Sequence, residues 1–376
     1  MKEECEVRPY RPGDEEEIVE LLELVFNGWP HKDLDCSPLD YWRWKFEDNP
    51  LKKRFITVAE KDDKIIGCLH VIPLRIKIGS KVFLCSTAVD FAVRPDLRGI
   101  GVSGKIRHLS EEKRRKAGVK LDYHITGNPI LIKSFLKRKP RFPYNIVNLV
   151  RIKDINKQLE AMPLDNAWII KLAFYTTKFF NDFRNSFIGK SRKHDLNISE
   201  IDSFSEKIDD FGKNISNHYD FIVERYREYL NWRYCDPRAG DFVVKQVEEN
   251  DRILGYSVSR INRYRQNYPI GYIVDLLTLP DRLDVADALV SDAIRYFDNE
   301  GINIINYQVV KGHPFESILK RYGFLDSRVK LQLFYTLTSK DDILSKIDQR
   351  YTEKTYLSWG DHYVLPVSMP SYERDI

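Results

Sequence analysis

Short runs of apolar residues separated by polar turns dominate the first part of the chain, and their spacing predicts strands and one early helix. Residues 5–9 form a short β-rich run. Asp14 and Glu17 have the spacing of a capping box. They precede a pattern of helical period, whose apolar positions are Ile18, Leu21, Leu22 and Val25. We therefore expect a strand followed by an amphipathic helix.

Residues 55–95 contain three β-rich runs separated by "KDDK" and "IGSK". Both separators have the turn residues of antiparallel hairpins. A glycine-rich stretch follows the third run directly. After it, "IRHLSEEKRRKAGV" has helical spacing up to Gly118, and "KLDYHI" is typical of another strand.

A short aromatic motif occurs twice, which predicts an internal duplication. Residues 41–50 are "YWRWKFEDNP" and residues 229–237 are "YLNWRYCDP", so Trp44 aligns with Trp232 and Lys45 with Arg233. Each copy is followed by a strand pair, another strand, a helix and a strand, in the same order. The recurrence extends over about 100 residues and favours two related domains. Tryptophans at such positions are typical of core and interface anchors.

Composition narrows the class of protein. A chain of 376 residues is long enough for two domains, and its net charge of +4 does not require a nucleic-acid partner. The five cysteines are scattered without a C-x-x-C pair, which favours reduced thiols and a cytoplasmic location. The most apolar segment, residues 167–183, is interrupted by charged residues, so we expect no membrane span. No metal-binding motif is present, and we expect no metal.

The glycine-rich stretch "VRPDLRGIGVSGKI" fits two phosphate-binding patterns. From Gly99 it resembles a P-loop, but Ile106 stands where the magnesium-binding hydroxyl would be, and a hydrocarbon side chain cannot bind a metal ion. From Arg98 it reads R-x-x-G-x-S, in which backbone amides at the start of a helix bind a pyrophosphate. The alternative is a simple strand-to-helix turn. The context of three strands before the loop and a helix after it favours pyrophosphate binding.

These residues together resemble the GNAT superfamily of acyl-CoA-dependent N-acyltransferases, over residues 5–142. A second, degenerate copy extends through "ILKRYGF" at 318–324, but its "LPDRLDVADAL" has no glycine pair and is not expected to hold a coenzyme. The implied fold class is α+β, with two GNAT-like domains, each a mixed and mostly antiparallel sheet flanked by helices. The implied boundaries are 1–148 for the coenzyme domain, 149–222 for a helical connector that includes an amphipathic helix at 168–183, 223–340 for the second domain and 341–376 for a C-terminal extension.

The resemblance implies acetyl-CoA, or another acyl-CoA, as co-substrate and assigns residues to it. The strand before the loop would pair with the pantetheine arm. Asn128 would contact the coenzyme or, alternatively, cap the following helix. The implied coenzyme-binding residues are Phe91, Ala92, Val93, Arg98, Gly99, Ile100, Gly101, Val102, Ser103, Gly104 and Asn128.

Acyl transfer to an amine requires a proton acceptor and a group that assists the departing thiolate. Asp90 is the first candidate for the base, because partial burial in an apolar strand would raise its pKa. His124 is the second candidate. Phe135 occupies the usual position of the family's tyrosine acid, so Tyr123, another group or water would serve instead. Alternatively, Asp90 is a carboxylate paired with a neighbouring group, and His124 has a structural role.

The resulting hypothesis is an N-acetyltransferase that acts on an amino sugar, a small amine or an amino acid. The alternative is a non-catalytic acyl-CoA-binding or sensing module. The sequence does not indicate the acceptor, the acyl length or the oligomeric state.

Overall fold

The structure is a computed structural model that describes residues 5–99, 101–137, 141–161, 175, 196–264, 267–338 and 354–363. Side chains are described for all of these except residues 130, 141–144 and 328–330. The chain divides into two compact units. Unit 1 contains Met1–Phe142, Phe221–Gly240 and Gln332–Asp348; unit 2 contains Pro143–Asp220, Asp241–Leu331 and Gln349–Ile376.

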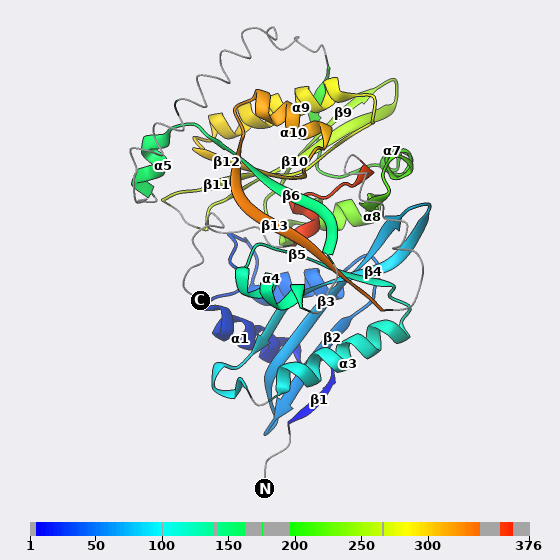
Figure 1. Ribbon diagram of the computed structural model, residues 1–376, viewed down its shortest axis with the longest axis vertical. Coiled ribbons are helices and arrows are strands. Elements are labelled where there is room, and N and C mark those ends of the chain that lie inside the picture. Colours follow the sequence, from blue (N-terminus) through cyan, green and yellow to red (C-terminus); the bar gives the residue numbers. More distant parts are fainter. Residues whose placement is uncertain are drawn as a thin grey trace. The chain divides into compact units, whose positions relative to one another are not determined.

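Unit 1 is built on a mixed sheet in the order β1-β2-β3-β4-β5-β13 (Figure 1). Among the described residues of this sheet, neighbouring strands are antiparallel except β4 and β5, which are parallel. β8 pairs with the end of β3. The predicted hairpins are confirmed. The strands are β1 (Glu6–Pro9), β2 (Phe55–Lys61), β3 (Lys64–Ile78), β4 (Lys81–Val93), β5 (Leu121–Thr126), β8 (Phe221–Val223) and β13 (Leu325–Leu337), of which Gln332–Leu337 pair with β5.

The helices of unit 1 include the two that were predicted from periodicity, and Asp14 is the N-cap residue of the first, without a side-chain capping bond. The capping box is wrong, because the Asp14 carboxylate accepts two hydrogen bonds from Arg8, at 2.8 and 2.9 Å, and Glu17 accepts one from Ile65 N at 3.0 Å. The helices are α1 (Glu15–Phe26), α2 (Pro38–Trp42), η1 (Arg43–Glu47), η2 (Pro95–Leu97), α3 (Val102–Lys116), α4 (Pro129–Leu136), α8 (Arg227–Leu230), η3 (Asn231–Cys235) and η4 (Pro237–Ala239).

The helix α3 packs directly on the sheet of unit 1 (Figure 1). Val102 and Ile106 are buried against apolar residues of β2 and β3. A Cβ atom at Gly67 would come within 2.9 Å of Ile106 Cδ1, so a glycine is needed for this close approach. This packing fixes the start of α3, and with it the glycine-rich turn, relative to β4.

Unit 2 repeats this plan with the sheet order β7-β9-β10-β11-β12-β6, in which only β11 and β12 are parallel. Its strands are β6 (Arg141–Ile152), β7 (Ile198–Glu200), β9 (Val243–Glu249), β10 (Arg252–Asn262), β11 (Ile270–Thr278) and β12 (Ile304–Val310). Its helices are α5 (Ile155–Ala161), α7 (Lys207–His218), α9 (Leu283–Asn299), α10 (Pro314–Arg321) and η7 (Trp359–His362). The strands of both units follow one path in a single mixed sheet, so the predicted mixed, mostly antiparallel pairing with flanking helices is confirmed.

The compact units are not contiguous in sequence, in contrast to the segments 1–148 and 223–340. β6 follows α4 along the chain but pairs with β12 in unit 2, and β13 follows α10 but ends against β5 in unit 1. Within 149–222 the described elements are the end of β6, α5, β7, α7 and the start of β8. The amphipathic helix expected at 168–183 lies outside the described residues apart from Tyr175.

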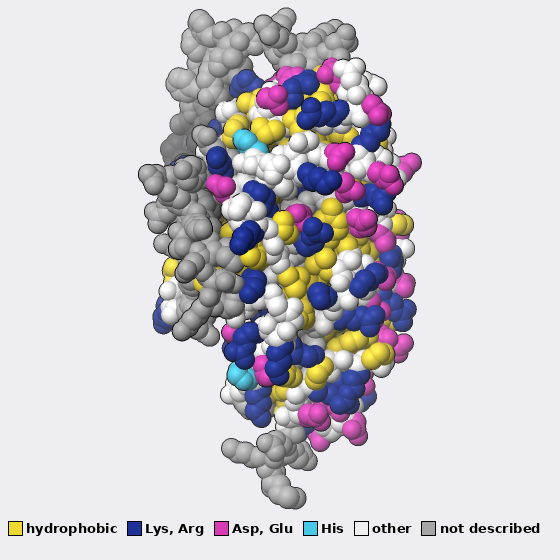
Figure 2. Space-filling view, turned by 90° about the vertical axis from the view of Figure 1, so that its right-hand side faces the viewer, with side chains coloured by type: hydrophobic (Ala, Val, Ile, Leu, Met, Phe, Trp, Pro, Cys, Tyr) yellow, Lys and Arg dark blue, Asp and Glu magenta, His cyan; other side chains and the backbone are white. Residues whose placement is uncertain are grey.

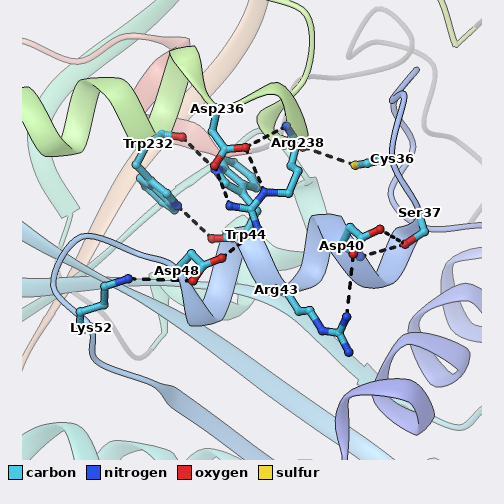
Figure 3. A network of polar contacts seen from close by, with 10 residues as sticks. All are labelled: Cys36, Ser37, Asp40, Arg43, Trp44, Asp48, Lys52, Trp232, Asp236 and Arg238. Atoms are coloured by element: carbon cyan, nitrogen blue, oxygen red, sulfur yellow. Dashed lines mark hydrogen bonds and ion pairs between the residues drawn. The ribbon is translucent and has the colours of Figure 1, made fainter. Parts of the chain in front are cut away.

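The two copies of the aromatic motif meet inside unit 1. In each, an α-helical turn continues into a π-helix, at Arg43–Glu47 and at Asn231–Cys235. Trp44 Nε1 donates to Trp232 O at 2.8 Å, and Trp232 Nε1 donates to Trp44 O at 2.9 Å (Figure 3). The rings stack with centroids 5.1 Å apart. The prediction that these tryptophans are buried anchors is confirmed.

Across the part of the chain that the structure describes, no helix combines the length and the apolar character needed to cross a bilayer.

Candidate active site

Strands β4 and β5 separate after a short parallel ladder. The ladder has three pairs, Cys85↔Leu121, Ser86↔Asp122 and Thr87↔Tyr123. Beyond Thr87, β4 continues to Val93 and β5 to Thr126. The divergence, which we call the first splay, leaves the edge of β4 from Asp90 to Val93 without a β5 partner.

A β-bulge lies in β4 at the first splay. His70 of β3 pairs with Val89 and Cys68 pairs with Ala92, so Asp90 and Phe91 together lie opposite Leu69. Asp90 has φ of 47°, in the left-handed region that aspartate tolerates better than most residues. The bulge therefore turns the peptide between Asp90 and Phe91 away from regular strand geometry.

The Asp90 carboxylate forms a buried ion pair. Lys45 Nζ lies 2.7 Å from Asp90 Oδ2, and the two side chains are only 3% and 12% exposed. Rings of Trp29, Tyr41 and Phe46 have their centroids within 6 Å of the Lys45 ammonium. Burial alone would lower the pKa of Lys45, but Asp90 outweighs burial and raises it.

The expectation of a raised pKa for Asp90 is wrong. Burial does act to raise the pKa of Asp90, but the Lys45 ammonium outweighs it and holds this pKa below its ordinary value. The paired-carboxylate alternative describes this residue better than a poised base does.

His70 is completely buried, and both of its ring nitrogens are hydrogen-bonded. Trp42 Nε1 donates to His70 Nε2 at 3.0 Å. His70 Nδ1 lies 3.1 Å from the carbonyl oxygen of Asp90. Burial lowers the pKa of His70 to about 4, so the ring is neutral at ordinary pH.

The glycine-rich turn is open to solvent and begins α3. Gly99 and Gly101 have φ of 86° and 89°, which other residues rarely adopt, and Gly101 is the N-cap. The first hydrogen bonds of α3 run from Gly104 N and Lys105 N to Gly101 O, so the amides of Val102 and Ser103 precede them. Arg98, Gly99, Gly101 and Gly104 are exposed, whereas Ile100 lies outside the described residues.

The P-loop interpretation fails in the structure. Ile106 is 0% exposed and packs in the core beneath α3, so neither its chemistry nor its place suits a metal ion. Among the described residues, no group of three acidic, histidine or cysteine side chains has the arrangement of a metal site.

Basic side chains line α3 beyond the turn. Lys and Arg residues gather on the face drawn in Figure 2, including its lower half. On α3 itself, the residues Lys105, Arg107, Arg115 and Lys116 are exposed. A polyanionic ligand at the start of this helix would meet favourable charge.

The remaining predicted residues lie on β5 and at α4. Tyr123 is 1% exposed, whereas His124 is partly exposed and its ring lies 5.3 Å from that of Phe135. Phe135 in turn contacts Phe334 at 5.3 Å. Asn128 Oδ1 accepts from Leu131 N at 3.2 Å, so this side chain does cap α4.

Comparisons with known proteins agree with this arrangement. Residues 6–129 match the family model described as an acetyltransferase (GNAT) domain. No curated protein sequence matches the chain. The chain contains a GNAT domain.

Solved structures resemble this chain over most of its length. Saccharomyces cerevisiae N-myristoyltransferase with bound myristoyl-CoA has a TM-score of 0.60 at 12% identity, covering 91% of this chain and 84% of that one. A GCN5-related N-acetyltransferase from Anabaena variabilis has a TM-score of 0.58 at 11% identity, covering 89% and 73%. A probable N-acyltransferase from Enterococcus faecalis has a TM-score of 0.59 at 10% identity, covering 89% and 73%. At such identities the likeness shows the fold.

Unit 2 contains a counterpart of the first splay. β11 and β12 share three pairs, Gly271↔Ile305 to Ile273↔Tyr307, and β11 then continues to Thr278. A register shift in β11 lies just before Asp275. The sequence V-D-x-x-x-x-P occurs in both strands, so Asp275 corresponds to Asp90 and Leu276 to Phe91. We call this divergence the second splay.

The second splay is filled by the chain itself. The Tyr356 hydroxyl lies 2.6 Å from Asp275 Oδ1 and 2.7 Å from Leu276 O, and it accepts from Leu276 N at 3.2 Å. Tyr256 also donates to Asp275, at 3.0 Å. At the start of α9, Arg282 binds the Asp284 carboxylate at 2.8 Å. One tyrosine hydroxyl thus lies against both the Asp275 carboxylate and the backbone edge at Leu276, and it accepts from Leu276 N.

Sequence reasoning missed the partners of Asp90, namely Lys45, His70 and Trp29. A signal existed, because a carboxylate within an apolar strand requires a cation or hydrogen-bond donors. Lys45 lies in the aromatic segment "YWRWKF", where a charged residue is unusual unless it is paired. Only the fold shows that these residues meet at β4.

Proposed function

We propose that this GNAT protein transfers the acetyl group of acetyl-CoA to an amine. The observation that carries the proposal is the exposed turn with left-handed Gly99 and Gly101, which leads into α3 directly beside the first splay. The GNAT domain and the acyltransferase fold support an acyl-CoA-dependent acyltransferase. The acetyl group and the amine class are our own assignment.

In this proposal the amides from Arg98 to Gly104 bind the pyrophosphate of the coenzyme. The positive end of α3 and its basic side chains favour this anion, and no metal ion is needed. The edge of β4 from Phe91 to Val93 pairs with the pantetheine arm, as an added strand would. Because Asn128 caps α4 in the structure, we place it after the glycine-rich turn and the β4 edge as a coenzyme contact.

The lowered pKa of Asp90 changes the proposed catalytic roles. A carboxylate that is held ionised by Lys45 accepts a proton poorly. We therefore propose that Asp90 stabilises the β-bulge of β4 and does not act as the base. His124 becomes the preferred base, because it is partly exposed on β5 just past the last ladder pair. Tyr123 remains the candidate acid, and unassisted departure of the thiolate is the alternative.

We propose that unit 2 is a second GNAT-like copy that holds no coenzyme. The matching order of strands and helices, the paired splays and the reciprocal Trp44–Trp232 hydrogen bonds support a duplication, because an isologous contact is reciprocal in this way. Tyr356 and Asp284 support the absence of a coenzyme, since they take the backbone edge and the helix start that it would use.

Thiol release tests the proposal directly. Purified protein is mixed with acetyl-CoA and a panel of amino sugars, small amines and amino acids, and free coenzyme A is measured. Myristoyl-CoA serves as a second donor, because one similar structure holds it. Acceptor-dependent release with acetyl-CoA is the expected result. Release with myristoyl-CoA alone would change the assigned acyl group but not the class of reaction.

The alternative function is a non-catalytic acyl-CoA-binding or sensing module. The loss of the usual tyrosine at Phe135 and the ion-paired Asp90 favour it. Tight acetyl-CoA binding without thiol release on a broad amine panel would establish it. We further propose a cytoplasmic location, supported by five cysteines that are all free.

A further inference from the structure

The hydrogen bonds of His70 determine which of its nitrogens carries the proton. An indole N–H only donates, so His70 Nε2, which faces Trp42 Nε1 at 3.0 Å, must be the acceptor. The proton of the neutral ring is then on Nδ1, which donates to the carbonyl oxygen of Asp90 at 3.1 Å. Trp42 thereby selects the tautomer that holds this carbonyl.

The orientation of one peptide follows from this bond. In a trans peptide the C=O and the N–H point in opposite directions. Because the Asp90 carbonyl points at the His70 ring, the Phe91 N–H points away from it. The same peptide follows the left-handed Asp90 and lies beyond the last β4–β5 pair, in the first splay.

Two buried groups hold this peptide in place. Lys45 binds the Asp90 side chain at 2.7 Å, and His70 binds the Asp90 carbonyl. A left-handed non-glycine residue is sparsely populated and persists where its surroundings over-determine it. Both anchors come from outside β4, the first from η1 and the second from β3.

We propose that His70 is a positioning residue for acyl transfer: its Nδ1–H fixes the Asp90–Phe91 peptide so that the Phe91 N–H donates to the thioester carbonyl of the bound acyl-CoA. The proposal rests on the proposed function. It goes further by naming one buried side chain, His70, as the support of the peptide that polarises the carbonyl. A donor aimed at the developing oxyanion stabilises the transition state more than the ground state, which lowers the barrier.

Three variants separate positioning from stability. His70→Leu removes the Nδ1–H donor. His70→Asn keeps a donor, because its carboxamide nitrogen takes the place of Nδ1. His313→Leu is the matched control: His313 is a buried histidine of unit 2 that accepts from Phe315 N at 3.3 Å and bonds the Tyr219 hydroxyl at 3.0 Å. Its loss should cost stability without touching the first splay.

We expect kcat to fall about tenfold to a hundredfold in His70→Leu, somewhat less than for removal of an oxyanion donor itself, with KM for acetyl-CoA nearly unchanged. His70→Asn should recover most of this loss, and His313→Leu should keep the kcat of the native protein. An unchanged kcat in His70→Leu, or an equal loss in His70→Asn, would overturn the proposal.

A second readout does not need turnover. The carbonyl stretch of ¹³C-labelled acetyl-CoA, measured by infrared spectroscopy in the complex, should shift to lower frequency in the native protein. The shift should vanish in His70→Leu and return in His70→Asn. A shifted stretch without thiol release would refute transfer and uphold the positioning role. An unshifted stretch in the native complex, or no binding at all, would refute the positioning role.

Discussion

The two splays share one backbone device and differ in what occupies it. In each, a three-pair parallel ladder ends and an irregular strand carries an aspartate followed by an apolar residue. In the first, Lys45 binds the Asp90 side chain and His70 binds the Asp90 carbonyl, and no residue of β5 pairs with β4 at Phe91. In the second, Tyr356 binds both Asp275 and the edge at Leu276.

The difference lies in how the hydrogen-bonding groups of each strand edge are satisfied. Both strand edges need hydrogen-bond partners, since buried backbone groups are costly to leave unpaired. The second splay obtains them from its own chain, whereas in our proposal the pantetheine arm of the coenzyme supplies them in the first. The helix starts differ in the same sense, with left-handed glycines before α3 and the Arg282–Asp284 pair at the start of α9.

Removing the cation of the first splay should have the largest effect. In Lys45→Met, Asp90 is left buried and unpaired, which should lower the free energy of unfolding of unit 1 by about 3–5 kcal/mol. Chemical denaturation followed by tryptophan fluorescence measures this loss. Unit 1 contains Trp29, Trp42, Trp44 and Trp232, so the signal reports mainly on it.

The double variant Lys45→Met with Asp90→Asn is the control for charge. Asparagine tolerates the left-handed backbone at position 90, and the double variant buries no charge. We expect it to regain at least half of the lost stability. If it is no more stable than Lys45→Met, packing around Lys45 matters more than the ion pair.

Tyr356→Phe should weaken unit 2 by a smaller amount. The change removes one hydroxyl and leaves the Leu276 backbone edge unsatisfied, which costs about 1–3 kcal/mol. Thermal unfolding monitored in unit 2 measures it. Tyr264→Phe, at a half-exposed position, should stay within about 0.5 kcal/mol of the native protein. If both substitutions had an equal effect, the hydroxyl of Tyr356 would not be what stabilises the strand edge at Leu276.

Gly104→Glu tests the anion site of the first splay. A Cβ atom added at Gly104 would meet no other atom within 4 Å, and Gly104 lies within α3 without a positive φ. A side chain therefore fits there without strain, in contrast to Gly101 at φ of 89°.

A carboxylate at position 104 should raise the Kd for acetyl-CoA about tenfold, since about 1.4 kcal/mol of repulsion is reasonable at a partly solvated site. Gly104→Ala is the matched control and should bind normally. Calorimetry distinguishes the two outcomes.

Much of this comparison was predictable from local sequence. Turn residues at "KDDK" and "IGSK" gave the hairpins, and the glycines at 99 and 101 indicated the turn before α3, because each feature depends on residues close together in the chain. The missing glycine pair in "LPDRLDVADAL" also pointed to a second copy without a coenzyme. The Arg282–Asp284 pair at the start of α9 is equally local.

The partners of Asp90 and Asp275 were not predictable in this way. Lys45 is 45 residues from Asp90, and Tyr356 is 81 residues from Asp275. Burial alone gave the wrong direction for the pKa of Asp90, since only the tertiary fold brings the ammonium to it. Continuous domain boundaries likewise followed from sequence order, whereas β6 and β13 join sheets across that order.

The smallest effect is expected at the start of α9. The Arg282 guanidinium lowers the pKa of Asp284, which is partly exposed in the first turn of the helix. Asp284→Asn should therefore cost only about 0.3–1 kcal/mol of stability. It should not create a second coenzyme site, because Tyr356 still binds the edge at Leu276 and no glycine turn is present. Calorimetric titration with acetyl-CoA should give one site per chain before and after the change. A stoichiometry that rises to two would mean that the aspartate charge, and not the tyrosine, keeps the second splay empty of ligand.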